Sequence, residues 1–514
     1  MILAKLNQPE FEYDIHSLIK AFYPEQNVSA TAEEKEYDEE VIFRIDIDYA
    51  PEQIRIALSE PLTKIGNGCA GDDSTSAAEV AFVEQMTQQF ALDFSDRKTT
   101  KNLLKRNLYQ MLACYSGKEL PWGTLTGIRP TKIPMKLLEE GKNREEIAQY
   151  MKDTYFASDE KIDLSIDIAE RELKLLQKID YENGYSLYIG IPFCPTTCLY
   201  CSFTSYPLSA WRSQVDAYLD ALEKEIQFVS VKFYHKKLNS IYIGGGTPTT
   251  LEPHQLDRLI RKIKCSFDLS HCVEFTVEAG RPDSITREKL EVLHKWGIDR
   301  ISINPQTMKD ETLKLIGRHH TVEQTIESYR MAKEVGFDNI NMDLILGLPG
   351  ETLEDVRNTM EQIKVLNPDN LTVHSLALKR AARLNIFKDD YKDYEMVNTQ
   401  EHMDLVYSYC KELDLKPYYL YRQKSMAGNL ENVGYAKSGK AGVYNILIME
   451  EKQTIMALGA GATTKFVFKP EEEDSTLDMR MERVENVKDV KNYLERVDEM
   501  IERKIRKMEE IKWH

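Results

Sequence analysis

The chain of 514 residues has no apolar run long enough to cross a bilayer. A membrane-spanning helix needs ~20 consecutive, mostly apolar residues, whereas charged residues interrupt the apolar stretches of this chain throughout. Residues 1–10 also lack the apolar core of a secretory signal. We therefore expect a cytoplasmic protein without a membrane span.

Basic residues are scarce relative to acidic ones. The chain has 67 Lys and Arg against 84 Asp and Glu, which gives a formal net charge of −17 at pH 7. Proteins that hold nucleic acid or an anionic membrane surface by non-specific attraction need clustered Lys and Arg instead. The composition therefore argues against nucleic acid and membrane surfaces as partners.

Cysteine is sparse as well, with eight in the chain, yet three of the eight stand close together. Cys194, Cys198 and Cys201 follow the pattern C-x3-C-x2-C after a short run rich in β-branched and aromatic residues. Such grouping favours metal binding in a reducing compartment over a disulfide framework. Three unrelated buried thiols are the alternative, because free cysteine often packs like a small hydrophobic residue.

Soft thiolate ligands in one tight loop suit either zinc or an iron–sulfur cluster. Zinc normally takes a fourth Cys or His at ligand spacing, but Cys265, Cys272 and His235 lie far along the chain. The spacing therefore favours a cluster held by three cysteines. One iron of a cubane cluster then has no protein ligand and can bind a substrate, as the open position of a catalytic metal site does.

From about residue 185 short apolar runs alternate with amphipathic segments, which predicts parallel βαβ units. We expect strands at 186–191, 239–243, 273–279, 299–304, 339–345 and 369–376. We expect helices at 210–234, 253–264, 284–296, 321–336 and 352–366. Six units of this kind predict an α/β fold with a partial (β/α)6 barrel, whose functional residues follow the carboxyl ends of the strands.

Glycine and polar residues stand at those strand ends. The run Gly244, Gly245 and Gly246 follows the second strand, where it lets a backbone approach a ligand and offers amide N–H groups, although glycines also make turns. Glu278 ends the third strand. An unpaired carboxylate there would be costly to bury, so we expect Glu278 to meet a ligand or a basic partner.

Four segments carry a family resemblance. IPFC at 191–194, GGGTPT at 244–249, IGRHH at 316–320 and DLILGLPGET at 343–352 occur in this order. They resemble the radical S-adenosylmethionine (SAM) superfamily, and within it the oxygen-independent coproporphyrinogen III oxidases and their paralogues. The resemblance covers roughly residues 185–465.

The resemblance implies a set of cofactor-binding residues. A [4Fe-4S] cluster would be held by Cys194, Cys198 and Cys201. The SAM molecule bound to the open iron would be held by Tyr188, Gly245 and Glu278. A second SAM would be surrounded by Tyr200, Gly246, Thr247, Gln306, Arg318 and Asp343. As alternatives, Tyr200 could be a core aromatic, and Arg318 and Asp343 could form a structural ion pair.

The resemblance also implies a reaction and its partners. In the family, a SAM-derived radical starts the oxidative decarboxylation of two propionates of coproporphyrinogen III to vinyl groups. The implied partners are the tetrapyrrole and an electron donor such as flavodoxin or ferredoxin, and we expect a monomer. Arginine matches carboxylate geometry, and the basic candidates for propionate pairing are Arg318, His319, His320, Lys379, Arg380 and Arg383. Solvated surface charge is the alternative for the last three.

Two departures bear on the choice between two functions: Phe203 favours a haem-chaperone-like paralogue, and the missing His at position 444 favours the oxidase. Oxidase members often carry a fourth cysteine where this chain has Phe203, and haem-chaperone-like paralogues have an aromatic residue there. Those paralogues carry a His-Asn-x-x-Tyr-Trp motif, whereas residues 442–449 keep Asn445 but have Tyr444 in place of the His. The alternative function is therefore a haem-binding paralogue that keeps the cluster and the SAM site without decarboxylating.

The pattern predicts four regions along the chain. Residues 1–100 form a small α+β domain, 101–180 a helical connector, 181–384 the barrel, and 385–514 a C-terminal α+β domain. In the first region we expect paired strands at 41–49 and 54–58 and a helix at 77–94. In the last, apolar residues at helical spacing predict one amphipathic helix at 484–508.

The connector contains a loop rich in glycine and proline at 121–132. A loop of this composition can be a plain connection. It can also be a lid that brings Arg129 and Lys132 to an anionic substrate.

Overall fold

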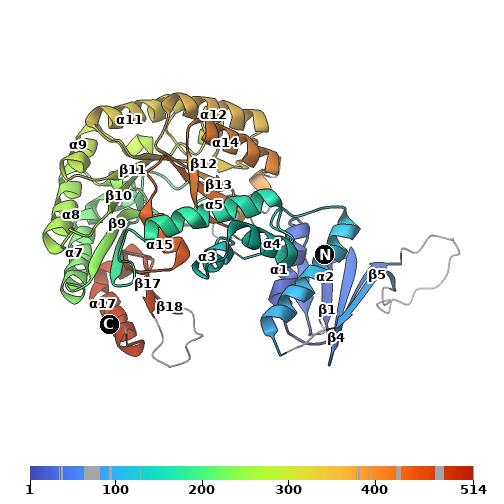
Figure 1. The fold of residues 1–514 in the computed structure, drawn as a ribbon. Coiled ribbons are helices and arrows are strands. Elements are labelled where there is room, and N and C mark those ends of the chain that lie inside the picture. The colour runs from blue at the N-terminus through green and yellow to red at the C-terminus, as the bar shows by residue number, and fades with distance from the viewer. Residues whose placement is uncertain are drawn as a thin grey trace, which may run out of the picture. The chain divides into compact units, whose positions relative to one another are not determined.

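The computed structural model covers the chain apart from short gaps. Nothing is described for residues 34, 36, 38, 63–80, 92–94, 128, 378, 380–381, 392, 424–429, 469–479 and 513–514, nor for the side chains of 388 and 389. The described residues form two compact units, Met1–Ile166 and Asp167–His514. Figure 1 shows both units, and each is described by itself.

The first unit is built on a five-stranded sheet with the order β2-β1-β3-β4-β5. Its strands are β1 (Ile2–Leu6), β2 (Val28–Thr31), β3 (Phe43–Ala50), β4 (Gln53–Pro61) and β5 (Phe82–Ala91). Alternate residues of β3, including Phe43, Ile45 and Ile47, are buried because successive side chains of a strand point to opposite faces. They share a core with helices α1 (Glu12–Phe22) and α2 (Arg97–Ser116).

The expected hairpin of the first unit is confirmed, because β3 and β4 pair antiparallel. The helix expected at 77–94 is wrong where the structure describes it, since Phe82–Ala91 is the edge strand β5. Its backbone pairs with β4, so sheet pairing prevails over the helical spacing of its side chains. Helices α3 (Lys132–Glu139), α4 (Arg144–Tyr155) and α5 (Asp159–Leu176) follow α2 in the connector region.

The second unit is built on an eleven-stranded sheet. Neighbouring parallel strands are β13 (Asn370–Ser375), β12 (Ile340–Leu346), β11 (Arg300–Ile303), β10 (Glu274–Gly280), β9 (Lys237–Gly245), β6 (Gly184–Ile191) and β16 (Thr454–Leu458). Antiparallel strands extend both edges: β15 (Asn432–Ala436) and β14 (Lys416–Tyr421) beyond β13, and β17 (Thr463–Phe468) and β18 (Arg480–Glu485) beyond β16. The six strands expected between 186 and 376 are therefore confirmed, and the C-terminal region adds a seventh parallel strand to the same sheet.

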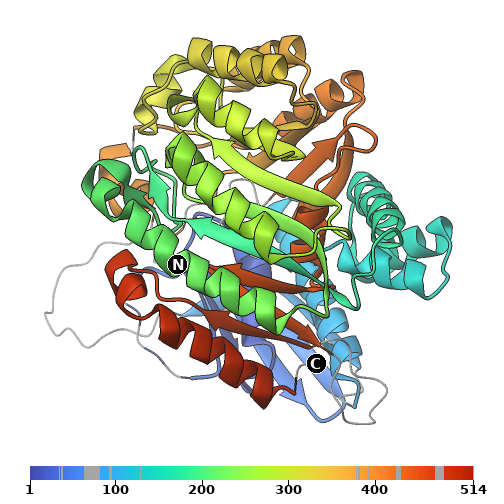
Figure 2. The same ribbon diagram turned by 90° about the vertical axis from the view of Figure 1, so that its left-hand side faces the viewer.

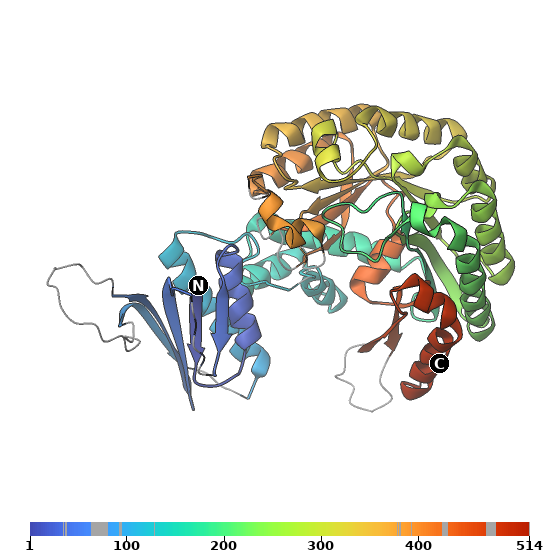
Figure 3. The same ribbon diagram turned by 180° about the vertical axis from the view of Figure 1, so that it is seen from behind.

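Helices cover the outer face of this curved sheet, as Figures 1 and 3 show from opposite sides. They are α7 (Val215–Lys232), α8 (Pro253–Ser266), α9 (Arg287–Lys295), α11 (Val322–Val335), α12 (Leu353–Leu366) and α14 (Gln400–Glu412). Capping boxes begin α8, α11 and α12 by satisfying free N–H groups of the first turn. Shorter elements are β7 (Phe193–Cys194), β8 (Tyr206–Pro207), α6 (Leu208–Trp211), α10 (Asp310–Leu315), α13 (Arg383–Ile386) and α15 (Val443–Glu450).

Alternation along the parallel strands separates an apolar face from a polar one. Leu187 and Ile189 of β6 are fully buried, whereas Tyr188 between them points to the other face and into the candidate site. Glu278 of β10 lies on this face too, because its carboxyl approaches Gly244 on the neighbouring strand. The sheet therefore collects polar groups on one face.

The single helix expected at 484–508 is wrong. The segment begins at the end of β18 and continues as two helices, α16 (Val490–Glu495) and α17 (Val497–Glu510). Figure 2 shows α17 beside α7. The buried side of α17 includes Lys504, which is fully buried, so a charged residue interrupts the expected apolar stripe.

The buried Lys504 is paired with the buried carboxylate of Glu225. Its Nζ lies 2.5 Å from Oε1 of Glu225 on α7, and both side chains are fully buried. Glu225 also accepts hydrogen bonds from the Tyr493 hydroxyl at 2.5 Å and the Gly459 N–H at 2.8 Å, and Asn486 donates to both of its oxygens. A buried ion pair survives desolvation only with such additional partners. One carboxylate therefore ties the C-terminal helices to the turn after β16.

Replacing Lys504 alone should be strongly destabilising. In Lys504→Met the Glu225 carboxylate stays buried without its counter-charge, and we expect a loss of about 3–5 kcal/mol in unfolding free energy. The control Arg506→Met removes an exposed ion pair of the same helix and should change stability by less than about 1 kcal/mol. Urea denaturation of all variants measures this. Equal losses of stability in Lys504→Met and Arg506→Met would contradict this account. The double variant Glu225→Gln/Lys504→Met should recover part of the stability that Lys504→Met loses, because no unpaired charge stays buried.

None of the described helices combines the length and the apolar character that crossing a membrane requires.

Candidate functional site

The cysteine loop leaves β6 and is held from two sides by backbone hydrogen bonds. The Leu199 N–H donates to the Ile316 carbonyl at 3.0 Å, and the Leu384 N–H donates to the Leu199 carbonyl at 2.9 Å. The Thr196 hydroxyl donates to the carbonyl of Gly317 at 3.0 Å. The IGRHH segment therefore serves to shape the cysteine loop.

Each of the three cysteine sulfurs has a hydrogen-bond donor beside it. The Thr247 hydroxyl lies 3.5 Å from Sγ of Cys194, Nη1 of Arg281 lies 3.8 Å from Sγ of Cys198, and a backbone N–H of the following loop donates to Cys201. Burial raises the pKa of the Cys194 thiol to about 11. Donors aimed at sulfur suit thiolates that bind iron, since hydrogen bonds to the sulfurs are a common feature of iron–sulfur sites.

The three thiols lie near one another, because Cys198 and Cys201 both raise the pKa of Cys194. Among the described residues, no group of three or more His, Cys, Asp or Glu side chains is placed to hold a single metal ion. In a cubane cluster each thiolate binds a different iron, so its three sulfurs surround the cluster instead of meeting at one ion. Three neighbouring thiols, each with its own donor, fit the cluster.

The glycine run lies directly against this loop. A Cβ at Gly246 would lie 2.6 Å from the Phe193 carbonyl oxygen and 3.0 Å from Sγ of Cys194, and Gly245 has φ +106°. The N–H of Gly246 donates to Ile191 O, and that of Thr247 donates to Phe193 O, both at 2.7 Å. The expectation that the run offers free amides is therefore corrected at Gly246, whose N–H group holds the cysteine loop as that of the following Thr247 does.

Glu278 meets neighbouring polar groups at its strand end. It accepts hydrogen bonds from the Tyr242 hydroxyl and the Gly245 N–H. Burial raises the pKa of the Glu278 carboxyl to about 7, and the charge of Asp343 acts in the same direction, whereas Arg300 opposes it. This carboxyl can therefore change between its neutral and ionised forms near neutral pH.

Three tyrosines stack beside Glu278. Tyr188 and Tyr242 occupy paired positions on β6 and β9, and Tyr444 at the start of α15 stacks on Tyr242 with ring centroids 4.5 Å apart. Tyr444 is 4% exposed. The residue that stands in place of the chaperone-like histidine is therefore part of the packed interior.

The residues predicted to surround a second SAM come from the cysteine loop, the segments that follow β9, β11 and α10, and strand β12. Tyr200 and Arg318 are hydrogen-bonded to each other, and Arg318 also donates to the Asn304 carbonyl. The backbone N–H of Gln306 donates to the Asp343 carbonyl at 2.9 Å. The carboxylate of Asp343 accepts from Asn341 at 2.7 Å, so its partner is an amide and not Arg318. Their roles toward SAM stay predictions.

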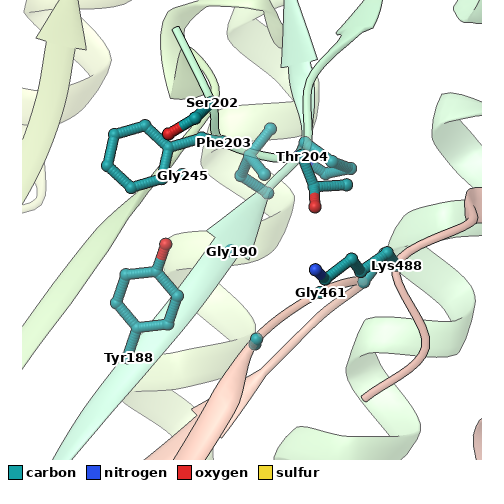
Figure 4. A pocket seen from close by; sticks show the side chains of 12 residues that line it. Tyr188, Gly190, Ser202, Phe203, Thr204, Gly245, Gly461 and Lys488 are labelled. Carbon is teal, nitrogen blue, oxygen red and sulfur yellow. The ribbon is translucent and has the colours of Figure 1, made fainter. Parts of the chain in front are cut away.

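A pocket of about 190 Å³ opens between the cysteine loop and the turn after β16. Figure 4 shows the Tyr188 hydroxyl and the Lys488 amine directed into it from opposite walls. Its lining comprises Tyr188, Gly190, Ile191, Pro192, Ser202, Phe203, Thr204, Gly245, Ala460, Gly461, Ala462 and Lys488. Two of the residues predicted to hold SAM, Tyr188 and Gly245, therefore face one cavity, and Lys488 is the only charged residue among those described in its lining.

Lys488 and Thr204 line the pocket but were not predicted from the sequence as site residues. Lys488 lies between β18 and α16, some 290 residues after the cysteine loop, and nothing in its surroundings distinguishes it from a surface lysine. Gly461, by contrast, belongs to a run of small residues, and a Cβ there would lie 3.0 Å from the Thr204 hydroxyl. In the sequence, this run of small residues was the one feature that could have indicated the pocket wall formed by Ala460, Gly461 and Ala462.

The basic residues expected near propionates differ in their surroundings. His320 is buried, and burial followed by the charge of Arg318 lowers its pKa to about 3, so its ring is neutral near pH 7. The Lys379 amine lies 5.6 Å from the ring centre of Phe203, and His319 is exposed. Arg383 begins α13, while Arg380 lies outside the described residues. Arg129 and Lys132 belong to the first unit, and their role as a lid stays a prediction.

The comparison with family models defines the class of protein. The radical SAM superfamily model matches residues 188–363, which include the cysteine loop, the glycine run and the strands that carry them. The chain is a radical SAM protein, and membership of this superfamily implies a [4Fe-4S] cluster and SAM.

Sequence relatives narrow the family. The chain is 42% identical over 435 residues to the oxygen-independent coproporphyrinogen-III oxidase-like protein HemZ of Bacillus subtilis, covering 83% of this chain and 85% of that protein. It is 41% identical over 198 residues to the heme chaperone HemW of Bacillus subtilis, covering 38% of this chain and 51% of that protein. The chain therefore belongs to the family of oxygen-independent coproporphyrinogen III oxidase-like proteins.

Among solved structures, coproporphyrinogen III oxidase HemN from Escherichia coli aligns with a TM-score of 0.49 at 24% identity, covering 64% of this chain and 73% of that one.

The family resemblance assigns Glu278 to SAM, and its raised pKa then predicts that SAM binding depends on pH. A carboxyl with a pKa of about 7 is ionised above that pH, and only the ionised form pairs with the ammonium group of SAM. We expect the affinity for SAM to fall as the pH drops below 7, by up to about tenfold per pH unit. Equilibrium dialysis of the reconstituted protein with SAM measures this. Glu278→Gln should bind more weakly and lose this component of the pH dependence; parallel curves for both proteins would contradict the assignment.

Proposed function

We propose that this chain is a radical SAM oxidoreductase that converts two propionates of coproporphyrinogen III to vinyl groups. In this conversion each propionate would lose CO2, one hydrogen atom to the 5′-deoxyadenosyl group derived from SAM, and one electron to an external one-electron acceptor. The observation that carries the proposal is the pocket beside the cysteine loop, which is lined by Tyr188 and Gly245 and contains one cationic group, Lys488. The similarity to an oxidase-like protein over 83% of the chain supports the same reaction class.

The chain's own residues would bind, orient and exclude water. Cys194, Cys198 and Cys201 would hold the cluster, which supplies the one-electron reduction of SAM when both are bound. Tyr188 and Glu278 would orient that SAM, the first at the pocket wall and the second through its carboxylate. A flavodoxin or ferredoxin would donate the electron to the protein, which we propose acts as a monomer.

A second candidate function is haem binding without decarboxylation. The observation that favours it is Phe203, which stands where oxidases often carry cysteine and is 70% exposed at the pocket. The partial similarity to heme chaperone HemW points the same way. Against it stands Tyr444, because a residue packed between other tyrosine rings is not free to ligate haem iron.

An anaerobic assay separates the two functions. The reconstituted protein is incubated with reductant, SAM and coproporphyrinogen III, and protoporphyrinogen IX and 5′-deoxyadenosine are measured. We expect both products, and neither in Cys201→Ala, because a cluster ligand is lost. Deoxyadenosine without a vinyl product would indicate another substrate. Tight haem retention with neither product would establish the second candidate.

Lys488 offers a test of substrate position. Because a hydrogen bond to a charged group is worth ~1.5–3 kcal/mol, Lys488→Met should raise the KM for the tetrapyrrole by about tenfold or more while the KM for SAM stays the same. Lys488→Arg should restore most of the affinity. Lys491→Met, an exposed lysine on α16, is the matched control. A rise in the KM for SAM alone would assign this wall to the cofactor instead.

A further inference from the structure

Arg281 is a buried guanidinium beside the cysteine loop that none of the roles above employs. It follows β10 and is 3% exposed. Its Nε and Nη2 lie 3.0 and 2.6 Å from the two carboxylate oxygens of Asp283. Its Nη1 donates to the carbonyl oxygen of Thr196 at 3.1 Å and to the Thr196 hydroxyl at 2.8 Å. The same Nη1 lies 3.8 Å from Sγ of Cys198.

These contacts use both edges of the guanidinium. One edge makes a bidentate pair with Asp283, the geometry that fixes an arginine most firmly. The other edge faces the cysteine loop between its first and second cysteines. Burial alone would raise the pKa of the Asp283 carboxyl, but its bonds to Arg281 hold that pKa below the ordinary value. A fixed positive charge thus stands at the Cys198 sulfur, with its counter-charge on the far side.

We propose that the Arg281–Asp283 pair sets the reduction potential of the cluster, with Arg281 as a positioning residue that raises the potential through Cys198 and Asp283 as the counter-charge that limits the rise. This inference rests on the proposed cluster and not on the identity of the substrate. Hydrogen bonds to sulfur and net charge are the main levers on the potential of an iron–sulfur cluster. Outer groups that orient and polarise the ligands act in the same way.

The sign follows from electrostatics. Reduction adds one electron from a low-potential one-electron donor, and no bond or proton moves in this step. A positive charge near Cys198 stabilises the more negative reduced cluster, so removing it lowers the potential. Removing Asp283 leaves the positive charge uncompensated, so the potential rises. The two halves of the pair therefore predict shifts in opposite directions.

The experiment compares Arg281→Gln, Asp283→Asn and the double variant in the reconstituted full-length protein. The midpoint potential is measured by redox titration with detection of the reduced cluster by electron paramagnetic resonance, and iron and sulfide contents are determined alongside. We expect each single variant to change the ratio of reduced to oxidised cluster about tenfold at a fixed ambient potential, which is about 59 mV for one electron. The shift should be downward for Arg281→Gln, upward for Asp283→Asn, and small for the double variant.

Two features keep the test specific. Arg318 also donates to Cys198 and is unchanged in every variant, so a shift belongs to the Arg281 pair. The matched control Arg287→Gln removes an arginine on α9 whose partner is Glu334 in an exposed pair, and it should leave the potential unchanged.

A purely structural role predicts a different result. Both single variants would then hold less iron, and the cluster that remains would titrate at the wild-type potential, which would overturn the proposal. Shifts of the two single variants in the same direction would overturn it as well. If Arg281→Gln fails to retain a cluster, Asp283→Asn still tests the proposal. An upward shift of its midpoint potential supports the proposal, and an absent shift overturns it. Because the titration requires no turnover, failure to decarboxylate the tetrapyrrole would refute the proposed function without affecting this readout.

Discussion

Two backbone hydrogen bonds between neighbouring loops determine where everything else in the site lies. The amides of Gly246 and Thr247, which follow β9, donate to the carbonyls of Ile191, the last residue of β6, and Phe193, the first residue of β7. They form only because position 246 carries no Cβ, which would collide with the Phe193 carbonyl and approach the Cys194 sulfur. These bonds hold the segment that carries Cys194 against the end of β9. They also fix Gly245, which lines the pocket, beside the same segment.

Two buried ion pairs, Glu225 with Lys504 and Asp283 with Arg281, connect distant segments in the interior of the second unit. Glu225 and Lys504 join the C-terminal helices to the turn that forms one wall of the pocket. Arg281 and Asp283 hold the cysteine loop from the other side. Since an unpaired buried charge is strongly unfavourable, these pairs specify which loops meet. Stability and site geometry therefore depend on the same residues.

The surroundings of two residues bear on the two functions proposed above. Phe203 is exposed at the pocket and departs from the oxidase pattern, while Tyr444 is packed in a stack and departs from the chaperone-like pattern. A solvent-facing aromatic beside a lysine can contact a flat macrocycle with carboxylates, whereas a buried tyrosine cannot reach haem iron. Phe203 therefore supports the haem-binding proposal, and Tyr444 supports the decarboxylase proposal.

The sequence by itself determined the parallel strands from 184 to 375, because alternating apolar runs and amphipathic helices leave few other arrangements. It also determined the cysteine loop and the glycine run, whose spacing is a local property. The strand at 82–91 was mistaken for a helix, because an edge strand is chosen by the partner it pairs with. Only the tertiary structure brought Lys488 to the pocket and Arg281 to Cys198, and only it buried Lys504 against Glu225. The sequence pattern around a charged residue does not indicate which residue it will contact. The contacts that define its role join segments that are distant along the chain.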